Sequence, residues 1–129
     1  MKVTYKQIVG AMSPLMELSN KEMDYSLALK ISRNIKEFER HYEDYQEEVN
    51  NLQQEYLDRD EEGNLIPVGE NGNTFKIKDG KTEELSEKLK TLDDFEVEAT
   101  TYMLSEEDFK DLKITPSILM GIDFLIFDE

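Results

Sequence analysis

The sequence predicts a mainly α fold of the α+β class, a long helical hairpin or bundle with a small antiparallel β-ribbon. The first observation behind this prediction is the stretch from residue 27 to 56, which contains neither proline nor glycine. Its apolar residues recur at alternating steps of four and three, which places one apolar seam along a helix face. The seam residues are Ile31, Ile35, Phe38, Tyr42, Tyr45, Val49, Leu52 and Tyr56. With Asp24 as its cap, this long acidic helix is expected at about residues 24–58.

A shorter helix is expected before the long one. Thr4 is suited to an N-cap, and apolar residues follow at helical spacing from Ile8 to Leu18. Pro14 lies inside this pattern and has no backbone N–H to donate. We therefore expect Pro14 to kink this first helix or to divide it.

The second observation is a turn-rich region that follows the long helix. Residues 60–64 combine acidic side chains with glycine and asparagine, and Asn71–Gly72–Asn73 is a strong turn signal. Short apolar runs at 65–68 and 74–77 lie on either side of that turn. They predict a two-stranded β-ribbon at about residues 64–78, in which Pro67 confines its strand to an edge.

The third observation is a set of helix-start signals in the last third of the chain. Thr82 is followed by two glutamates, which suits the start of a helix that ends near Asp93–Asp94. Residues 95–99 then alternate as a half-buried strand does. Ser105 and Asp108 have the spacing of a capping box and open a brief helix.

Thr115–Pro116 starts the last helix, with a cap residue followed by proline in the first turn. This helix is expected to run to about Phe127 and is apolar on nearly all sides. It should therefore be the most buried piece of the fold, or it should dock onto a second chain. The C-terminal helices together occupy about residues 82–127, and residues 1–129 are expected to form a single domain.

Charge is the most distinctive feature of the composition. The 129 residues include 30 acidic and 15 basic side chains, which gives a net charge of −15. Residues 37–62 hold eleven acidic and two basic side chains, a net charge of −9. Such a field repels nucleic acid and favours basic protein surfaces, so direct nucleic-acid binding is not expected. The same charge also serves solubility, which is the simpler interpretation.

Cysteine usage and the apolar segments narrow the class of protein further. The chain contains no cysteine, which excludes disulfides, thiolate nucleophiles and cysteine-based zinc sites. Its N-terminal residues do not have the form of a signal peptide, and the apolar run from Ile118 to Phe127 is too short to span a bilayer. We expect no membrane association and a cytoplasmic location in a host cell.

One stretch partly matches a calcium-binding loop. Asp58, Asp60 and Glu62 stand at the first, third and fifth positions of an EF-hand pattern, with Gly63 at the sixth. The twelfth position, which needs a bidentate glutamate, is Gly69. These residues are therefore a weak calcium candidate, and the favoured interpretation is an acidic turn that ends the helix. No other metal site and no cofactor are expected.

No group of residues indicates catalysis, so the protein is not expected to be an enzyme. His41 is the only histidine, and it is interpreted as a surface residue or one at the edge of the seam. The glycines are spaced for turns and lack the lysine and hydroxyl residues of a phosphate-binding loop. The tyrosines of the seam are interpreted as core residues with hydroxyls that can reach water.

Three stretches occur in the same order as in one known family. They are residues 30–36, residues 55–64 around Glu55–Tyr56 and Asp60 to Asn64, and Ile114 to Met120. With them the chain resembles a family of small, acidic, uncharacterised proteins from tailed phages and prophages of Gram-positive bacteria. The resemblance implies a phage origin and a similar helical pattern, and it carries no established catalytic residues.

Two functions are therefore expected as alternatives. The first is a phage-derived counter-defence inhibitor, anti-CRISPR-like, whose acidic surface mimics nucleic acid and blocks the basic groove of a host nuclease. The expected partner-binding residues are Glu37, Glu39, Glu43, Asp44, Glu47, Glu48 and Glu55, with Asp58, Asp60, Glu61 and Glu62 at the helix end. The second is a structural or assembly accessory of the phage particle that acts through helix–helix oligomerisation, for example as a homodimer.

Overall fold

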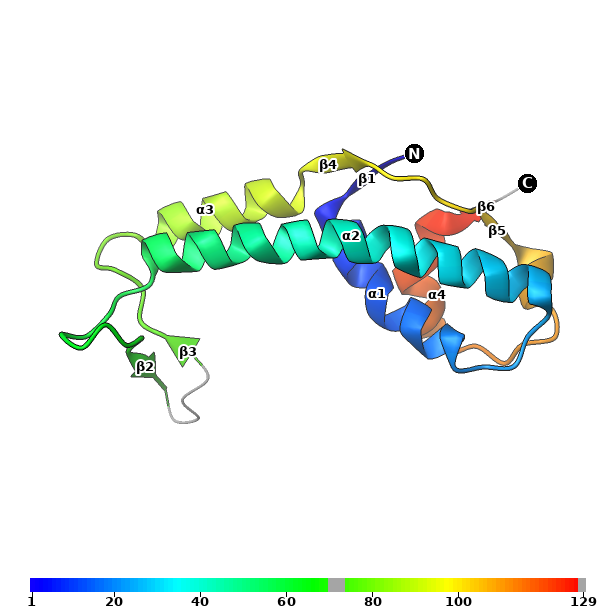
Figure 1. Cartoon of the computed structure of the whole chain (residues 1–129), viewed down its shortest axis with the longest axis horizontal. Coiled ribbons are helices and arrows are strands. Elements are labelled where there is room, and N and C mark those ends of the chain that lie inside the picture. Colours follow the sequence, from blue (N-terminus) through cyan, green and yellow to red (C-terminus); the bar gives the residue numbers. More distant parts are fainter. Residues whose placement is uncertain (70–73, 128–129) are drawn as a thin grey trace. The chain divides into compact units, whose positions relative to one another are not determined.

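The computed structural model describes residues 1–69 and 74–127 and divides the chain into two compact units. The first unit comprises residues 1–43 and 94–129, and the second comprises residues 44–93. Helix α2, Tyr25–Tyr56, contributes its first part to one unit and its last part to the other (Figure 1). The mainly α prediction with a small β part is confirmed, whereas the single domain stays a prediction because compactness does not measure whether units unfold together.

The first unit begins with a short strand that leads directly into a helix. Strand β1, Lys2–Thr4, pairs antiparallel with β4, Glu96–Glu98, so that Val3 lies opposite Val97. Helix α1, Tyr5–Ser19, starts at a capping box in which the Gln7 backbone N–H donates to Thr4 Oγ1 and the Thr4 N–H donates to Gln7 Oε1. The N-cap is thus confirmed, while the strand before it was not foreseen because its partner lies over 90 residues away.

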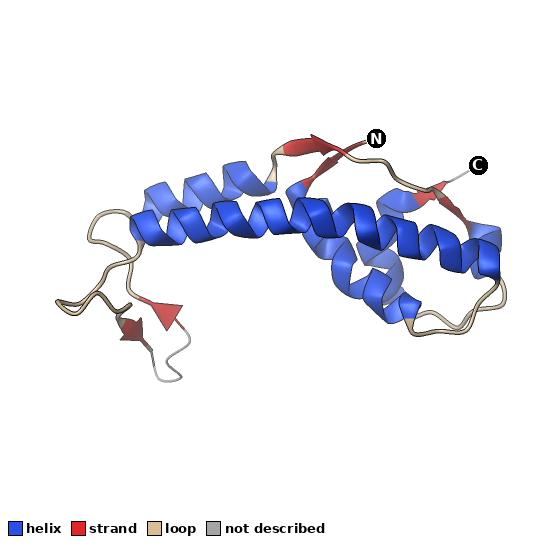
Figure 2. Ribbon diagram, viewed as in Figure 1, coloured by secondary structure: helices blue, strands red, loops and turns tan. Residues whose placement is uncertain are grey.

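Pro14 does not divide α1, so the part of the prediction that allowed division is wrong. The Gly10 carbonyl has no N–H to accept at position 14, because proline lacks one. That carbonyl faces Gly121 of helix α4, Pro116–Ile122, where a Cβ atom would lie 2.8 Å from it and 2.4 Å from Pro14 Cγ. The two helices therefore approach closely at a proline and a glycine, and Figure 2 shows them side by side.

The first part of α2 buries a line of residues that includes two polar side chains. The line consists of Leu27, Ile31, Asn34, Phe38 and His41. His41 is only 6% exposed, so of its two predicted places the surface is wrong, and the edge of the seam is compatible with its burial. The helix period of 3.6 residues carries the buried face through position 41, whereas the seam expected from apolar residues passed beside it.

The C-terminal segment is less helical than the sequence predicts. Strand β5, Leu104–Ser105, precedes the 3₁₀ helix η1, Glu106–Phe109, which begins at the expected capping box of Ser105 and Asp108. Helix α4 ends at Ile122 and not near Phe127, and a second 3₁₀ turn, η2, follows at Asp123–Leu125. Strand β6, Ile126–Phe127, then pairs in parallel with β5, and this pairing replaces the last helical turns that were predicted.

Burial of α4 is one-sided. Ile118 and Ile122 are buried, whereas Leu119 is 37% exposed and Met120 is 79% exposed. The first alternative of the prediction, that this helix is the most buried piece of the fold, does not hold for the face that carries Leu119 and Met120. Docking of that face onto another chain stays a prediction.

The second unit is a pair of helices, and the chain segment that connects them contains a β-ribbon. The last part of α2 lies beside helix α3, Thr82–Asp93, and the ribbon consists of β2, Pro67–Val68, and β3, Thr74–Phe75 (Figure 1). The strands are antiparallel, as predicted, with Pro67 opposite Phe75. The turn predicted at Asn71–Gly72–Asn73 lies outside the described residues. Within the described part of the chain, no helix has the length and apolar character that a membrane crossing needs.

Candidate functional site

The candidate site is an acidic surface on the second unit, built on the last part of α2. Asp44, Glu48 and Glu55 follow one another at steps of four and seven, so they lie along one stripe of the helix. All three are exposed, and Glu47 adds a further exposed carboxylate on the same segment. The half-buried side chains of this segment, Tyr45, Val49 and Leu52, lie on a neighbouring face of the helix. The acids of the stripe lie outside that face and remain in solvent.

Two tyrosine–carboxylate hydrogen bonds hold the helices that carry this surface. The Tyr45 hydroxyl donates to Asp93 Oδ1 at 2.8 Å, and the Tyr56 hydroxyl donates to Glu84 Oε1 at 2.8 Å. Each bond joins one end of the α2 segment to one end of α3. The sequence placed the tyrosines in the seam, but it did not reveal that acidic residues of α3 accept hydrogen bonds from their hydroxyls.

The hydrogen bond between Tyr56 and Glu84 shifts the pKa values of both groups, and each shift favours the protonation state that forms the bond. The hydrogen bond to the Glu84 carboxylate, together with burial, raises the pKa of Tyr56 to about 12. The hydrogen bond from the Tyr56 hydroxyl has the largest effect on Glu84 and lowers its pKa below the ordinary value. The ammonium of Lys81, whose Nζ lies 3.1 Å from Glu84 Oε2, lowers the pKa of Glu84 further. The carboxylate of Glu84 is therefore ionised and engaged near neutral pH.

The helix end carries an acidic turn in place of a calcium loop. Asp60 Oδ1 accepts from the backbone N–H groups of Glu62 and Asn64, and Asp58 Oδ2 forms an ion pair with Lys76 at 3.5 Å. The turn closes where Arg59 pairs with Leu65. The three carboxylates of the calcium candidate are thus not grouped, and no metal-holding group of three acidic, histidine or cysteine residues occurs among residues 1–69 and 74–127.

Some of the predicted partner-binding carboxylates form hydrogen bonds or ion pairs within the protein, and others do not. Glu37 in the first unit accepts from Arg40 and from the backbone N–H of Thr100, so it is committed to the fold. Burial acts to raise the pKa of Glu37, but these hydrogen bonds outweigh it and lower that pKa. Glu39 and Glu43 of the same unit are exposed.

In the second unit, Asp58 and Asp60 are occupied by the turn described above. The remaining predicted residues are exposed and have no hydrogen-bond or ion-pair partner for their carboxylates in the described part of the chain. They are Asp44, Glu47, Glu48, Glu55, Glu61 and Glu62.

A set of contacts that the sequence did not predict fixes an extended segment onto α2 in the first unit. Asn34 is fully buried, its Nδ2 donates to the Tyr102 carbonyl at 2.9 Å, and its Oδ1 accepts from the Tyr102 N–H at 2.7 Å. The Arg33 guanidinium lies over the Tyr102 ring, 5.3 Å from its centroid. A polar residue one turn from Ile31 on an otherwise apolar line was the available signal.

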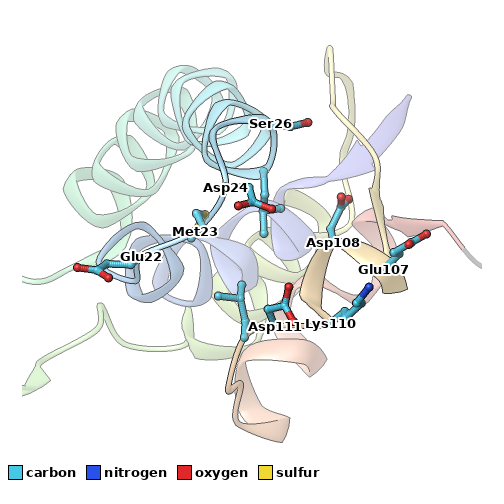
Figure 3. A pocket seen from close by; sticks show the side chains of 10 residues that line it. Glu22, Met23, Asp24, Ser26, Glu107, Asp108, Lys110 and Asp111 are labelled. Carbon is cyan, nitrogen blue, oxygen red and sulfur yellow. The ribbon is translucent and has the colours of Figure 1, made fainter.

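A cavity of about 570 Å³ lies in the first unit beside the start of α2 (Figure 3). Asp24, Asp108 and Asp111 contribute carboxylates to its lining, and Met23, Leu27 and Leu112 contribute apolar surface. Asp108 is occupied, because Lys30 Nζ donates to its Oδ2 at 3.1 Å. Burial acts to raise the pKa of Asp108, but the Ser105 N–H and Lys30 outweigh it and lower that pKa.

Comparison of the chain with models of protein families, with curated proteins and with solved structures gives no match. The resemblance to phage and prophage proteins therefore stays a prediction.

Proposed function

We propose that this protein is a non-enzymatic interaction protein that uses the acidic surface of its second unit to bind a basic protein surface. The observation that supports the proposal is a set of six exposed carboxylates that have no partner among residues 1–69 and 74–127, at Asp44, Glu47, Glu48, Glu55, Glu61 and Glu62. Carboxylates that are neutralised within a protein contribute little field, whereas unpaired ones attract Lys and Arg of a partner and speed association.

The stripe imitates the phosphate backbone of a nucleic acid at lower charge density. Asp44, Glu48 and Glu55 place three charges over about 16 Å of helix axis, since each residue rises about 1.5 Å. One strand of DNA carries about five phosphates over the same length, at about 3.4 Å per phosphate. Glu47 and the turn residues Glu61 and Glu62 add to this density, so the partner that fits is a protein whose Lys and Arg side chains normally contact a nucleic acid backbone.

The resemblance to phage proteins would make the target a host nuclease with such a basic groove, a CRISPR effector being one example. Blocking that groove would protect phage nucleic acid, which is the counter-defence role. The protein would need no catalytic residue for this role, because occupation of the groove is sufficient.

A pull-down with matched charge variants tests the proposal. The test variant carries D44N, E47Q, E48Q and E55Q, and the control carries E17Q, E22Q, E96Q and E107Q, which are exposed acids of the first unit. Both change the net charge from −15 to −11. From a nuclease-treated bacterial lysate, we expect wild type and control to retain a nucleic-acid-binding protein at low salt and release it at high salt.

The test variant should retain that partner about tenfold less, because each exposed ion pair contributes about 0.2–1 kcal/mol. Equal loss in the control would show that only total charge matters. Retention of the partner by all three proteins would place the binding surface elsewhere and contradict the proposal.

The alternative, an assembly accessory that acts by oligomerisation, is favoured by one observation. Leu119 is 37% exposed and Met120 is 79% exposed on α4, and contiguous exposed apolar side chains mark contact surfaces more often than single ones do. It predicts a concentration-dependent oligomer, measurable by sedimentation equilibrium, that persists in high salt and is lost in M120S. A monomer over the whole concentration range would contradict it.

A further inference from the structure

A second cavity of about 470 Å³ lies in the first unit. Its apolar lining comes from Phe109, Leu119 and Ile126, which belong to η1, α4 and β6. Glu106 and Asp123 supply two carboxylates to the same lining. The volume is within the range of about 300–1,000 Å³ that is typical of ligand pockets.

The lining remains open to solvent. Leu119 is 37% exposed, and neither Glu106 nor Asp123 has a hydrogen-bond or ion-pair partner for its side chain among the described residues. An apolar floor favours a bulky apolar group, while the two unpaired carboxylates favour cationic neighbours of that group. A second copy of this chain is a poor occupant, because it would bring carboxylates against carboxylates and carries a net charge of −15.

We infer that this pocket binds a short segment of a partner protein that inserts one bulky apolar side chain between flanking Lys or Arg residues. The site differs from the acidic surface of the second unit in its position and in its apolar contact. It goes beyond the proposed function and does not rest on it. A contact of this kind would hold when salt has weakened the purely electrostatic contacts.

Peptide fluorescence tests the inference, since the chain contains no tryptophan and the signal comes from the peptide alone. The probe is an eight-residue peptide with one tryptophan between two pairs of lysines, titrated with the full chain in about 0.3 M NaCl to screen charges that lie beyond contact distance. We expect saturable binding with a blue shift of the tryptophan emission. A peptide with glutamates in place of the lysines should not bind, and one with alanine in place of tryptophan should not compete.

Two neighbouring residues provide matched variants. L119S removes a side chain that lines the pocket, and M120S removes a more exposed side chain that does not line it. We expect L119S to weaken binding about tenfold or more and M120S to change it less than about twofold. Likewise E106Q should weaken binding, while E107Q, the next residue in the same turn, should leave it unchanged.

Several results would overturn the inference. They are the absence of a blue shift, equal binding of the lysine and glutamate peptides, equal effects of L119S and M120S, or a dimer of the chain that L119S abolishes. The combined variant D44N/E47Q/E48Q/E55Q should still bind the peptide, so failure here and failure of the proposed function are distinguishable.

Discussion

At the scale of single residues, Asn34 is a buried polar side chain of a helix that holds another segment by hydrogen bonds to its backbone. Its amide reproduces both hydrogen bonds of a β-pairing with the backbone of Tyr102, at 2.9 and 2.7 Å. A leucine at position 34 would suit the apolar line better, but it would leave the Tyr102 N–H and carbonyl without these partners. The residue therefore selects where the segment after β4 lies on α2.

Replacement of Asn34 by alanine should lower the free energy of unfolding by about 1–3 kcal/mol, the cost of leaving such groups unpaired. Urea denaturation at neutral pH measures this change. The control is N50A on the same helix, at an exposed position without a side-chain partner in the described chain, where the effect should be below about 0.7 kcal/mol. Equal effects of the two substitutions would contradict the role given to Asn34.

A second prediction at the residue scale concerns the approach of α1 to α4. G121A should lower the free energy of unfolding by about 1–3 kcal/mol, because its Cβ would lie 2.4 Å from Pro14 Cγ and 2.8 Å from the Gly10 carbonyl oxygen. G10A has no neighbour within 4 Å of the added Cβ, so its better helix propensity should stabilise the protein by about 0.5–1 kcal/mol. Thermal unfolding should thus give opposite signs for the two variants, and a stable G121A protein would show that the close approach is absent.

At the scale of elements, local signals predicted most helix and ribbon bounds well. The long helix was expected at about 24–58 and is observed at Tyr25–Tyr56, and the predicted N-cap at Thr4 and capping box at Ser105 are present. These features depend on neighbouring residues, which sequence patterns record. The pairings of β1 with β4 and of β5 with β6 were missed, because short strands pair through backbone groups that leave little trace in side-chain patterns.

The burial pattern of α2 shows a further limit. The seam was drawn through apolar residues at a period of 3.5, and it passed beside Asn34 and His41, both of which are buried. A pattern that treats every polar residue as exposed cannot place these two. The predicted partner-binding acids were expected to be available to a partner, but the sequence did not show that Glu37 of the first unit accepts hydrogen bonds from Arg40 and Thr100.

The bond between α2 and α3 at Tyr56 gives a prediction at this scale. A raised pKa of about 12 means that the protonated hydroxyl is favoured in the folded state. Its contribution to stability is complete below about pH 10, the unfolded value, and is lost as the pH rises through about 12. The free energy of unfolding should therefore fall less steeply with pH between 10 and 12 in Y56F than in the wild type.

Carbon NMR of the tyrosine ring reports the same group directly. The resonance that disappears in Y56F should titrate at about 12 in the wild type and move toward 10 in E84Q, which lacks the carboxylate. A resonance that titrates near 10 in the wild type would show that the hydrogen bond is absent in solution.

At the scale of the whole molecule, the two units differ in how much apolar surface they bury. Among the described residues, the second unit has three buried apolar side chains, Tyr56, Leu57 and Leu85. In the first unit, the buried apolar side chains of α1 include Ile8, Leu15 and Leu18, and further buried apolar side chains come from α2 and α4. A thin core provides less stabilisation per residue, so the second unit should open more readily.

Hydrogen exchange measures this difference. Backbone amides of α3 should exchange at least tenfold faster than those in the middle of α1, after correction for intrinsic rates. The same experiment tests the single-domain prediction, because a domain that opens only globally would show equal protection in both units. Stronger protection in α3 than in α1 would contradict the assignment of the thinner core.

The proposed function requires that the exposed carboxylates of the second unit bind the nucleic-acid-binding surface of a partner. The most direct test is competition, in which the anisotropy of a labelled DNA duplex bound to the retained partner is followed as this protein is added. We expect the wild type and the E17Q/E22Q/E96Q/E107Q control to displace the duplex, while D44N/E47Q/E48Q/E55Q does so only at about tenfold higher concentration. A partner that holds this protein and the duplex together, with unchanged anisotropy of the bound DNA, would contradict it.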